Sequence, residues 1–317
     1  MNGLSREEHI SNCVRALVKK PDFPAFSEHI QKVLAATDDE EASVRELTNL
    51  IIRDYSLTLK LLRASNAYNF SGRPILSITH ALTMLGTEAL RHLASSLLIF
   101  EHFHNKPAGV RELMMLSMLT ANHVRGIARH VPCLKPEEAY LCGMLRNLGE
   151  VLAAYYLPGP YTKILTLIKE RRSPVSVACQ QILHFTFEDL GEAVARYWGM
   201  PEKVATSVRA DLPISGPTDS PRNLLLAAVS MGHRITTAVY RMEPEGGPSR
   251  LKVCTWDYSS VLPLTREDVE EILKSAVSET QESFAAIGVP IDELHLETQT
   301  RRALNAHPTR CFGALPW

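Results

Sequence analysis

The sequence lacks an excess of either charge, any closely spaced pair of cysteines and any long apolar run. Its 317 residues include 34 Lys plus Arg and 35 Asp plus Glu. This balance does not provide the basic surface by which proteins bind the phosphate backbone of nucleic acids. Non-specific nucleic-acid binding is therefore not expected, and a transcription factor is disfavoured for the same reason.

The six cysteines lie far apart and form no Cys-x-x-Cys pair. Such spacing argues against a zinc site and suits buried thiols in a reducing compartment, whereas a six-cysteine disulfide framework would be unusual in a chain of this length. The first residues lack the charged-then-apolar layout of a signal peptide. No run reaches the ~18–20 apolar residues that cross a bilayer. We expect a soluble cytoplasmic protein with no membrane partner.

Motifs for catalysis and cofactor binding are also absent. The sequence contains no Gly-x-Ser-x-Gly elbow, no glycine-rich phosphate loop and no Gly-x-Gly-x-x-Gly fingerprint. His123 and His130 would share one helix face, but seven residues separate them by roughly 10 Å, which is too far for joint metal ligation. We therefore expect no catalytic residue, no metal and no cofactor.

What the sequence does contain is helical periodicity along most of its length, which predicts an all-α fold. Ser43, with Glu46 three residues later, predicts a capping box at one helix start. Asp54 interrupts an apolar run and is expected to cap the next helix through exposed backbone N–H groups. Ser77 is expected to begin a helix that Gly86 ends in a left-handed conformation.

Later in the chain, Pro136 is expected to start a helix that runs to about Tyr156, where Pro158-Gly159-Pro160 breaks the chain. Further helices are expected near residues 161–172, 175–183, 190–198, 202–211 and 222–240. Residues 243–263 are interpreted as an exposed connection, with 251–256 extended. Thr265, with Asp268 three residues later, is expected to open an amphipathic helix that ends near residue 287. The tail 289–317 receives no assignment.

Three motifs in fixed order are the most informative feature. Asp54 is followed by Leu61-Leu62-Arg63-x-x-Asn66, then by Ile78-x-x-Ala81-x-x-x-Leu85-Gly86, and later by Gly143-Met-Leu-Arg146-Asn147-Leu-Gly149-Glu150. Together they resemble the HDOD family, relatives of the HD phosphohydrolases, over roughly residues 14–235. The family motif residues with expected structural roles are Asp54, Arg63, Asn66 and Gly86. Asn66 is expected to satisfy backbone groups where its helix ends.

The resemblance also implies where the metal ligands of the HD phosphohydrolases would fall. None of these positions carries a histidine here, and the residues present are Leu116, Arg146, Asn147, Phe187, Ala210 and Asp211, with Glu150 at the place of the Lys that follows the His-Asp pair. A guanidinium at the place of the His-Asp pair stays protonated and would repel a divalent cation. Arg146 either pairs with Glu150, four residues along, or holds the carboxylate or phosphate of a ligand.

The resemblance implies a helical N-terminal lobe at 1–105, a degenerate HD-like lobe at 106–240 and a linker, amphipathic helix and tail at 241–317. It implies a bacterial signal-transduction domain without catalysis that binds other signalling proteins, and a homodimer is left open. One alternative is a sensor that binds a nucleotide or cyclic dinucleotide in the vacated HD cleft. A second alternative is residual metal-dependent phosphohydrolase activity.

Overall fold

The computed structural model describes residues 4–19, 32–33, 35–37, 43–67, 75–98, 109–197, 202–209, 220–241, 247–286 and 295–305. Within these ranges every regular element is a helix, and the predicted all-α class is confirmed. In the same ranges, no helix combines the length and the apolar character needed to cross a bilayer.

The chain divides into two compact units, each built from two separate segments. Unit 1 comprises Met1–Met114 and Leu145–Arg209, and unit 2 comprises Met115–Met144 and Ala210–Trp317. The division passes through helix α6 (Val110–Arg129). The sequence-based lobes at 1–105 and 106–240 stay a prediction, because proximity between residues does not test which segments fold independently.

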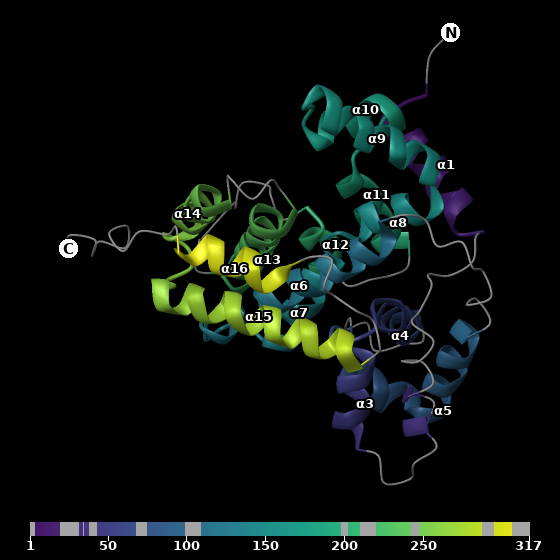
Figure 1. Ribbon diagram of the computed structural model, residues 1–317. Coiled ribbons are helices and arrows are strands. Elements are labelled where there is room, and N and C mark those ends of the chain that lie inside the picture. Colours follow the sequence, from purple (N-terminus) through teal and green to yellow (C-terminus); the bar gives the residue numbers. More distant parts are fainter. Residues whose placement is uncertain are drawn as a thin grey trace. The chain divides into compact units, whose positions relative to one another are not determined.

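Unit 1 contains the motif helices of the first half and a second set that follows Leu145 (Figure 1). The first set is α1 (Arg6–Leu17), α3 (Val44–Ile51), α4 (Tyr55–Ala67) and α5 (Ile78–Leu98). The second set is α8 (Leu148–Tyr156), α9 (Pro158–Arg171), α10 (Val175–Leu183), α11 (Phe187–Tyr197) and α12 (Glu202–Ser207). Fully buried leucines of α4 and Ile78 and Leu90 of α5 supply apolar core where these two helices pack together.

The helix starts predicted at Ser43, Asp54 and Ser77 are confirmed. Ser43 and Glu46 form a reciprocal capping box at α3. The carboxylate of Asp54, fully buried, accepts a hydrogen bond of 2.7 Å from the backbone N–H of Leu57 at the start of α4. Ser77 accepts from the N–H of His80 at the start of α5. Each side chain satisfies a backbone donor that the first helical turn leaves without a partner.

Gly86 has a positive φ, as expected, but its conformation differs from the one predicted. Its φ of 81° and ψ of 168° lie outside the left-handed helical region and in a region that is essentially restricted to glycine. Residues on both sides remain helical, so α5 is kinked at Gly86. The kink therefore lies at the residue where the sequence predicted that the helix would end.

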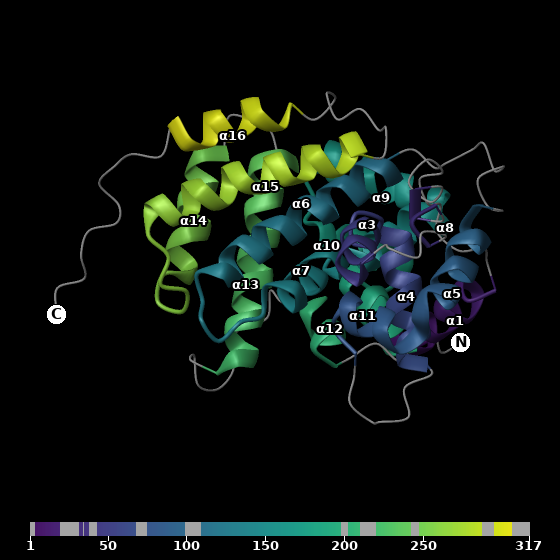
Figure 2. The same cartoon turned by 90° about the horizontal axis from the view of Figure 1, so that it is seen from below.

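Unit 2 contains most of α6 and the helices α7 (Pro136–Leu145), α13 (Pro221–Thr236), α14 (Gly247–Tyr258), α15 (Arg266–Ala286) and α16 (Leu296–Asn305). A π-helix, η2 (Thr237–Arg241), continues α13. Helices α15 and α16 run side by side (Figure 2). The predicted start of α15 is confirmed, because Thr265 and Asp268 exchange side-chain and backbone hydrogen bonds.

Two predictions about elements are wrong, and one segment that received no assignment is helical. The helix expected from Pro136 to Tyr156 is interrupted at Arg146 and Asn147, where Asn147 has φ −94° and ψ 14°. The segment expected to be extended at 251–256 is helical and belongs to α14, because Leu251 and Cys254 are buried one turn apart. The unassigned tail contains α16, whose buried residues Leu296, Thr300 and Ala303 follow helical spacing.

Candidate functional site

The interruption between α7 and α8 places Arg146 and Asn147 in a two-residue connection. The Asn147 conformation lies in the bridge region of the backbone map, where active-site residues are often found. Two further positions that the resemblance singled out, Glu150 and Phe187, lie on α8 and at the start of α11. We call Arg146, Asn147, Glu150 and Phe187 the degenerate site. All four belong to unit 1.

Close packing of α8 on α11 brings the degenerate site together. A Cβ atom added at Gly149 would lie 1.8 Å from the carbonyl oxygen of Phe187 and 2.7 Å from the backbone nitrogen of Gly191. Only a hydrogen atom fits at this contact, so Gly149 and Gly191 allow the two backbones to touch. The glycine frame of the motif therefore positions Phe187 directly against α8.

Arg146 is buried within unit 1 and faces a carboxylate. Its side chain is 3% exposed, and its Nη1 lies 3.9 Å from Oε1 of Glu188, which is 38% exposed. A buried guanidinium needs a negative partner, because removing its charge from water is costly. The ion pair with Glu188 thus stabilises the buried guanidinium of Arg146.

Glu150 is held by a tyrosine. The hydroxyl of Tyr161 on α9 donates a hydrogen bond of 3.0 Å to Oε1 of Glu150, and both side chains are buried. The Tyr161 ring lies 5.9 Å from the ring of Phe187, centroid to centroid. Aromatic packing therefore fills the space beside Glu150 where the resemblance placed a family histidine.

Next to the degenerate site lies an ion cluster that the sequence patterns did not reveal. Asp189 is almost completely buried and accepts a hydrogen bond of 3.0 Å from Nε of Arg6 on α1. Arg209, at the end of α12, pairs with both Asp189 and Glu192. Thr186 and Asp189 also form a reciprocal cap at the start of α11. The Thr-x-x-Asp spacing was a usable signal for the cap, but nothing in the sequence linked Arg6 to Asp189.

Burial and nearby charges shift the pKa values of Asp189 and Cys179 in opposite directions. Burial alone would raise the pKa of Asp189, but the hydrogen bonds from Arg6 and Thr186 and the charge of Arg209 outweigh it and lower the pKa. Burial, assisted by the charge of Glu188, raises the pKa of Cys179 to about 12. Because the thiolate is the reactive form, Cys179 is a poor nucleophile at neutral pH.

The residues of the degenerate site do not fit a divalent cation. Arg146 brings a fixed positive charge, and Asn147 offers only a neutral amide where an HD protein has a carboxylate. The carboxylates nearby already accept from Tyr161, Arg6 and Arg209. Throughout the ranges that the structure describes, no group of three or more His, Cys, Asp or Glu side chains is arranged to hold a metal ion.

The other positions from the resemblance are placed as follows. Leu116 is buried on α6 within unit 2, and Ala210 and Asp211 lie outside the described residues. Asn66 has the structural role that was predicted. Its Oδ1 accepts from the N–H of Ile75 at 2.9 Å, and its Nδ2 donates to the carbonyls of Leu62 and Ile75. Arg63 is half-buried on α4.

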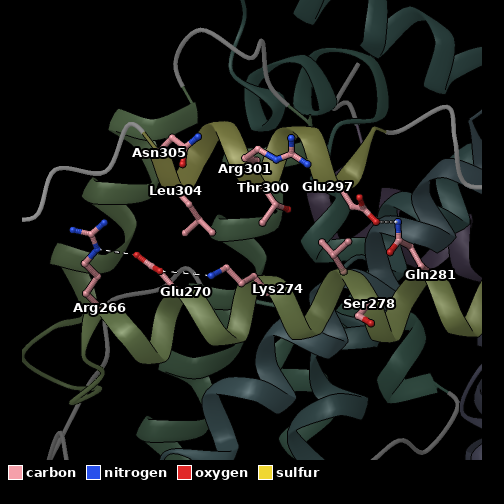
Figure 3. A pocket seen from close by; sticks show the side chains of 11 residues that line it. Arg266, Glu270, Lys274, Ser278, Gln281, Glu297, Thr300, Arg301, Leu304 and Asn305 are labelled. Carbon is pink, nitrogen blue, oxygen red and sulfur yellow. Dashed lines mark hydrogen bonds and ion pairs between the residues drawn. The ribbon is translucent and has the colours of Figure 1, made fainter.

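A cavity of about 650 Å³ lies between α15 and α16 in unit 2. Arg266, Glu270 and Lys274 form a ladder of ion pairs at one end, and Gln281 donates to Glu297 at the other (Figure 3). Leu304 and Thr300 point into the space between these ends (Figure 3). No sequence pattern indicated the cavity, because α16 was not predicted. Its carboxylates bind donors of the same chain, and no contact singles out a ligand.

Solved structures of similar fold come from several bacteria. The response regulator MmoQ of Methylococcus capsulatus has a TM-score of 0.59 and 20% identity, covering 79% of this chain and 97% of that structure. A virulence factor of Campylobacter jejuni has a TM-score of 0.64 and 13% identity, covering 86% and 96%. An HDOD domain protein of unknown function from Geobacter sulfurreducens has a TM-score of 0.50 and 20% identity, covering 89% and 97%.

A sequence relative occurs in Treponema pallidum, where it is described only as an uncharacterized protein. The two sequences are 24% identical over 190 residues, which are 59% of this chain and 37% of that protein. This chain therefore spans well under two thirds of the relative. The sequence profile of the HDOD domain matches residues 23–212, which include α3 to α5, α8 and α11 and all the motif residues. The chain belongs to the HDOD domain family.

Proposed function

We propose that this HDOD chain is a non-catalytic signal-transduction protein that acts by binding other proteins. The observation that carries the proposal is Arg146. The guanidinium stands where the HD phosphohydrolases have their His-Asp pair, is 3% exposed, and pairs with Glu188 within unit 1. Arginine stays protonated at every physiological pH, so this position repels the ion that hydrolysis would need.

Membership of the HDOD family supports the signalling part of the proposal. One structure of similar fold is described as a response regulator. The state of two potential nucleophiles near the degenerate site supports the non-catalytic part. The thiol of Cys179 is protonated, and the hydroxyl of Tyr161 donates to Glu150. Neither the thiol of Cys179 nor the hydroxyl of Tyr161 is therefore activated as a nucleophile.

Metal analysis and a turnover assay on the purified full chain test this proposal. We expect less than stoichiometric transition metal by mass spectrometry, and no hydrolysis of bis(p-nitrophenyl) phosphate above the buffer rate with Mn²⁺ or Mg²⁺. The matched control is Glu150→Gln, which removes a buried carboxylate of the degenerate site. Stoichiometric metal together with turnover that this variant abolishes would overturn the proposal in favour of residual phosphohydrolase activity.

The alternative of a nucleotide or cyclic-dinucleotide sensor requires the same residues to reach a ligand phosphate. Arg146, Asn147 and Glu150 are each at most 8% exposed, and α8 is in backbone contact with α11. A phosphate would have to separate packed helices before it met the guanidinium. This burial favours protein binding by another surface over ligand binding in the former metal site.

A further inference from the structure

Helix α14 presents a pair of apolar side chains to solvent in unit 2. Trp256 is 69% exposed, and Val253 is 53% exposed. Successive residues of a helix are rotated by about 100°, so positions that differ by three residues lie about 60° apart on one face. The indole of Trp256 and the side chain of Val253 are therefore neighbours on the surface of α14.

The opposite face of α14 holds the helix in the unit. Leu251 and Cys254 are buried, and they have the same spacing as the exposed pair. The midpoint of this buried pair precedes the midpoint of Val253 and Trp256 by two residues, which corresponds to about 160° around the helix. Helix α14 packs on α13, η2 and α16 within unit 2 (Figure 2). The exposed pair thus points away from these packing partners, at the centre of the solvent face.

The edges of this face carry one charge of each sign. Single exposed apolar residues are ordinary on a protein surface, but tryptophan is among the side chains most enriched where proteins bind one another. Lys252 is exposed at the edge beside Trp256, and Asp257 lies at the edge beside Val253. Asp257 pairs with Arg234 on α13 at 2.7 Å. An apolar centre is therefore flanked by a cation on one side and an ion pair on the other.

We propose that this face binds the same face of a second copy of the chain, so that two α14 helices pack antiparallel about a two-fold axis. The inference goes beyond the proposed function and does not depend on it. A partner with an excess of one charge would meet a like charge at one edge, whereas an identical face presents both signs. The whole chain has 34 basic and 35 acidic side chains, so two copies approach without net repulsion.

A two-fold axis between Val253 and Trp256 determines which side chains meet. The two indoles would be offset by about 4.5 Å along the helix axis, which suits an offset aromatic pair. Lys252 would lie within about 1.5 Å, along the same axis, of Trp256 of the second copy, and on the same edge. Its ammonium group therefore reaches the face of that ring in a cation–π contact. A parallel pair would instead place Asp257 against the ring, whose negative face repels a carboxylate.

The chemistry of the face fits a second copy better than a lipid surface. A helix that lies in a membrane interface is rich in Lys and Arg beside its apolar side chains. Among the α14 residues whose exposure the structure describes, Lys252 is the single exposed cation, and Asp257 is an anion of similar exposure class. Attraction to anionic lipid would therefore be weak.

Sedimentation equilibrium of the purified full chain tests the self-association. Two apolar side chains from each copy make a small contact, so we expect a dimer with a dissociation constant on the order of 10–100 µM. Trp256→Ser should weaken this dimer at least tenfold. The matched control is Tyr197→Ser in unit 1, at a residue that is 57% exposed, which should stay within twofold. Val253→Asp replaces the first variant if that protein melts early.

Lys252 distinguishes the antiparallel pair from a non-specific apolar contact. Lys252→Glu should weaken the dimer at least threefold, because it places a carboxylate on the indole of the second copy. Lys252→Arg should stay within twofold, because a guanidinium also binds the face of the ring. Lys163→Glu on α9 makes the same change of net charge at another exposed lysine. Equal weakening by Lys252→Glu and Lys163→Glu would overturn the antiparallel arrangement.

Photo-crosslinking locates the contact on the chain. A genetically encoded benzophenone at Val253 is irradiated in a mixture of isotope-labelled and unlabelled chains, which separates products between copies from products within one copy. We expect a covalent dimer in which position 253 is joined to α14 of the second copy. The same group at Tyr197 should give none. Products that join position 253 to another element, or to its own chain, would overturn the inference.

A chain that stays monomeric at about 500 µM would also overturn the inference, because that concentration exceeds the dissociation constants of most weak protein pairs. Vesicles of anionic phosphatidylserine provide a further arm. Sedimentation of the chain with these vesicles, lost in Trp256→Ser, would assign the face to a membrane instead. The proposed function fails on a different measurement, metal-dependent turnover, so the two failures are distinguishable.

Discussion

At the scale of single residues, Gly149 sets the tightest requirement near the degenerate site. Its Cα atom lies against the backbone of α11 at Phe187 and Gly191. Any side chain at position 149 would separate α8 from α11, which carries Glu188, the partner of Arg146. Packing at this point therefore determines the geometry of that ion pair.

Substituting Gly149→Ala should destabilise the protein by about 3 kcal/mol or more, because overpacking at a backbone contact cannot be relieved by rotating a side chain. Urea unfolding measures this change. The control is Gly159→Ala, where no atom lies within 4 Å of the added Cβ. That variant should gain up to about 1 kcal/mol from helix propensity. Equal stability of the two variants would show that α8 does not pack on α11 as described.

Asp189→Asn should destabilise the protein by about 2 kcal/mol at pH 7, because hydrogen bonds to charged arginines are lost. The folded pKa of Asp189 lies below its usual value of 3.8, so the stabilisation is present above that value and is lost as pH falls through the folded pKa. Unfolding free energies of the unmodified and variant chains should therefore converge as the pH falls below 3.8. Asp257→Asn, which affects a more exposed pair with Arg234, should cost less than about 1 kcal/mol.

At the scale of elements, a polar seam joins α6 to α13 and α16 inside unit 2. His123 on α6 is fully buried, and its Nδ1 lies 2.9 Å from the hydroxyl of Thr236 on α13. The ring stacks on Tyr240 in the π-helix η2, and Tyr240 hydrogen-bonds Thr300 on α16. Burial lowers the pKa of His123 to about 3. The seam therefore holds a neutral imidazole.

His123 should make the stability of the protein depend on pH between 6.5 and 3. The unfolded chain binds a proton on this histidine below 6.5, whereas the folded chain does not until about pH 3. The free energy of unfolding therefore decreases by up to about 1.4 kcal/mol for each unit by which the pH is lowered in this range. His123→Gln should lose this slope, and His80→Gln, at an exposed position, should keep it. Parallel slopes for all three chains would contradict the burial of His123.

Local chemistry made many elements predictable. Side-chain caps at Ser43, Asp54, Ser77 and Thr265 lie within a few residues of the donors that they satisfy, so the sequence alone contained the signal. The role of Asn66 was predictable because its amide lies where the helix ends, although one of its partners, Ile75, is nine residues away. The interruption at Arg146 was not predicted, because no Pro marks it and Asn147, although at the N-cap position of α8, makes no side-chain cap hydrogen bond there.

Contacts between distant segments explain the rest of what the sequence did not reveal. Arg6 and Asp189 are 183 residues apart, and Asn122 on α6 donates to Thr280 on α15 across 158 residues. Helix α14 was mistaken for a connection because Gly246, Gly247 and Pro248 suggested a loop. The motifs located Arg146, Asn147, Glu150 and Phe187, but Tyr161 and Glu188 became visible only through the fold.

At the scale of the whole molecule, the degenerate site lies inside unit 1 and not on its surface. Arg146, Asn147 and Glu150 are buried, and the hydroxyl of Tyr161 on α9 donates to Glu150 on α8. A partner or ligand that binds without separating these helices must therefore contact other residues.

Cyclic dinucleotides and mononucleotides should leave the melting temperature unchanged, because the degenerate site is buried. The measurement is differential scanning fluorimetry of the full chain at increasing ligand concentration. A ligand of the degenerate site would instead stabilise the protein by about 2.7 kcal/mol at a hundredfold excess over its dissociation constant. A shift that Arg146→Gln abolishes would favour the sensor alternative over the proposed function.

The ion pair between Arg6 on α1 and Asp189 on α11 also has a consequence for folding during synthesis. Because synthesis runs at ~5–20 residues per second, α1 leaves the ribosome on the order of 10–40 seconds before α11 does. During that interval Val14 and Leu17, which are buried in the finished protein, have no α11 to pack against. A nascent chain arrested before residue 187 should therefore be a substrate for chaperones and proteases at its first helix, even though that helix carries its own capping box.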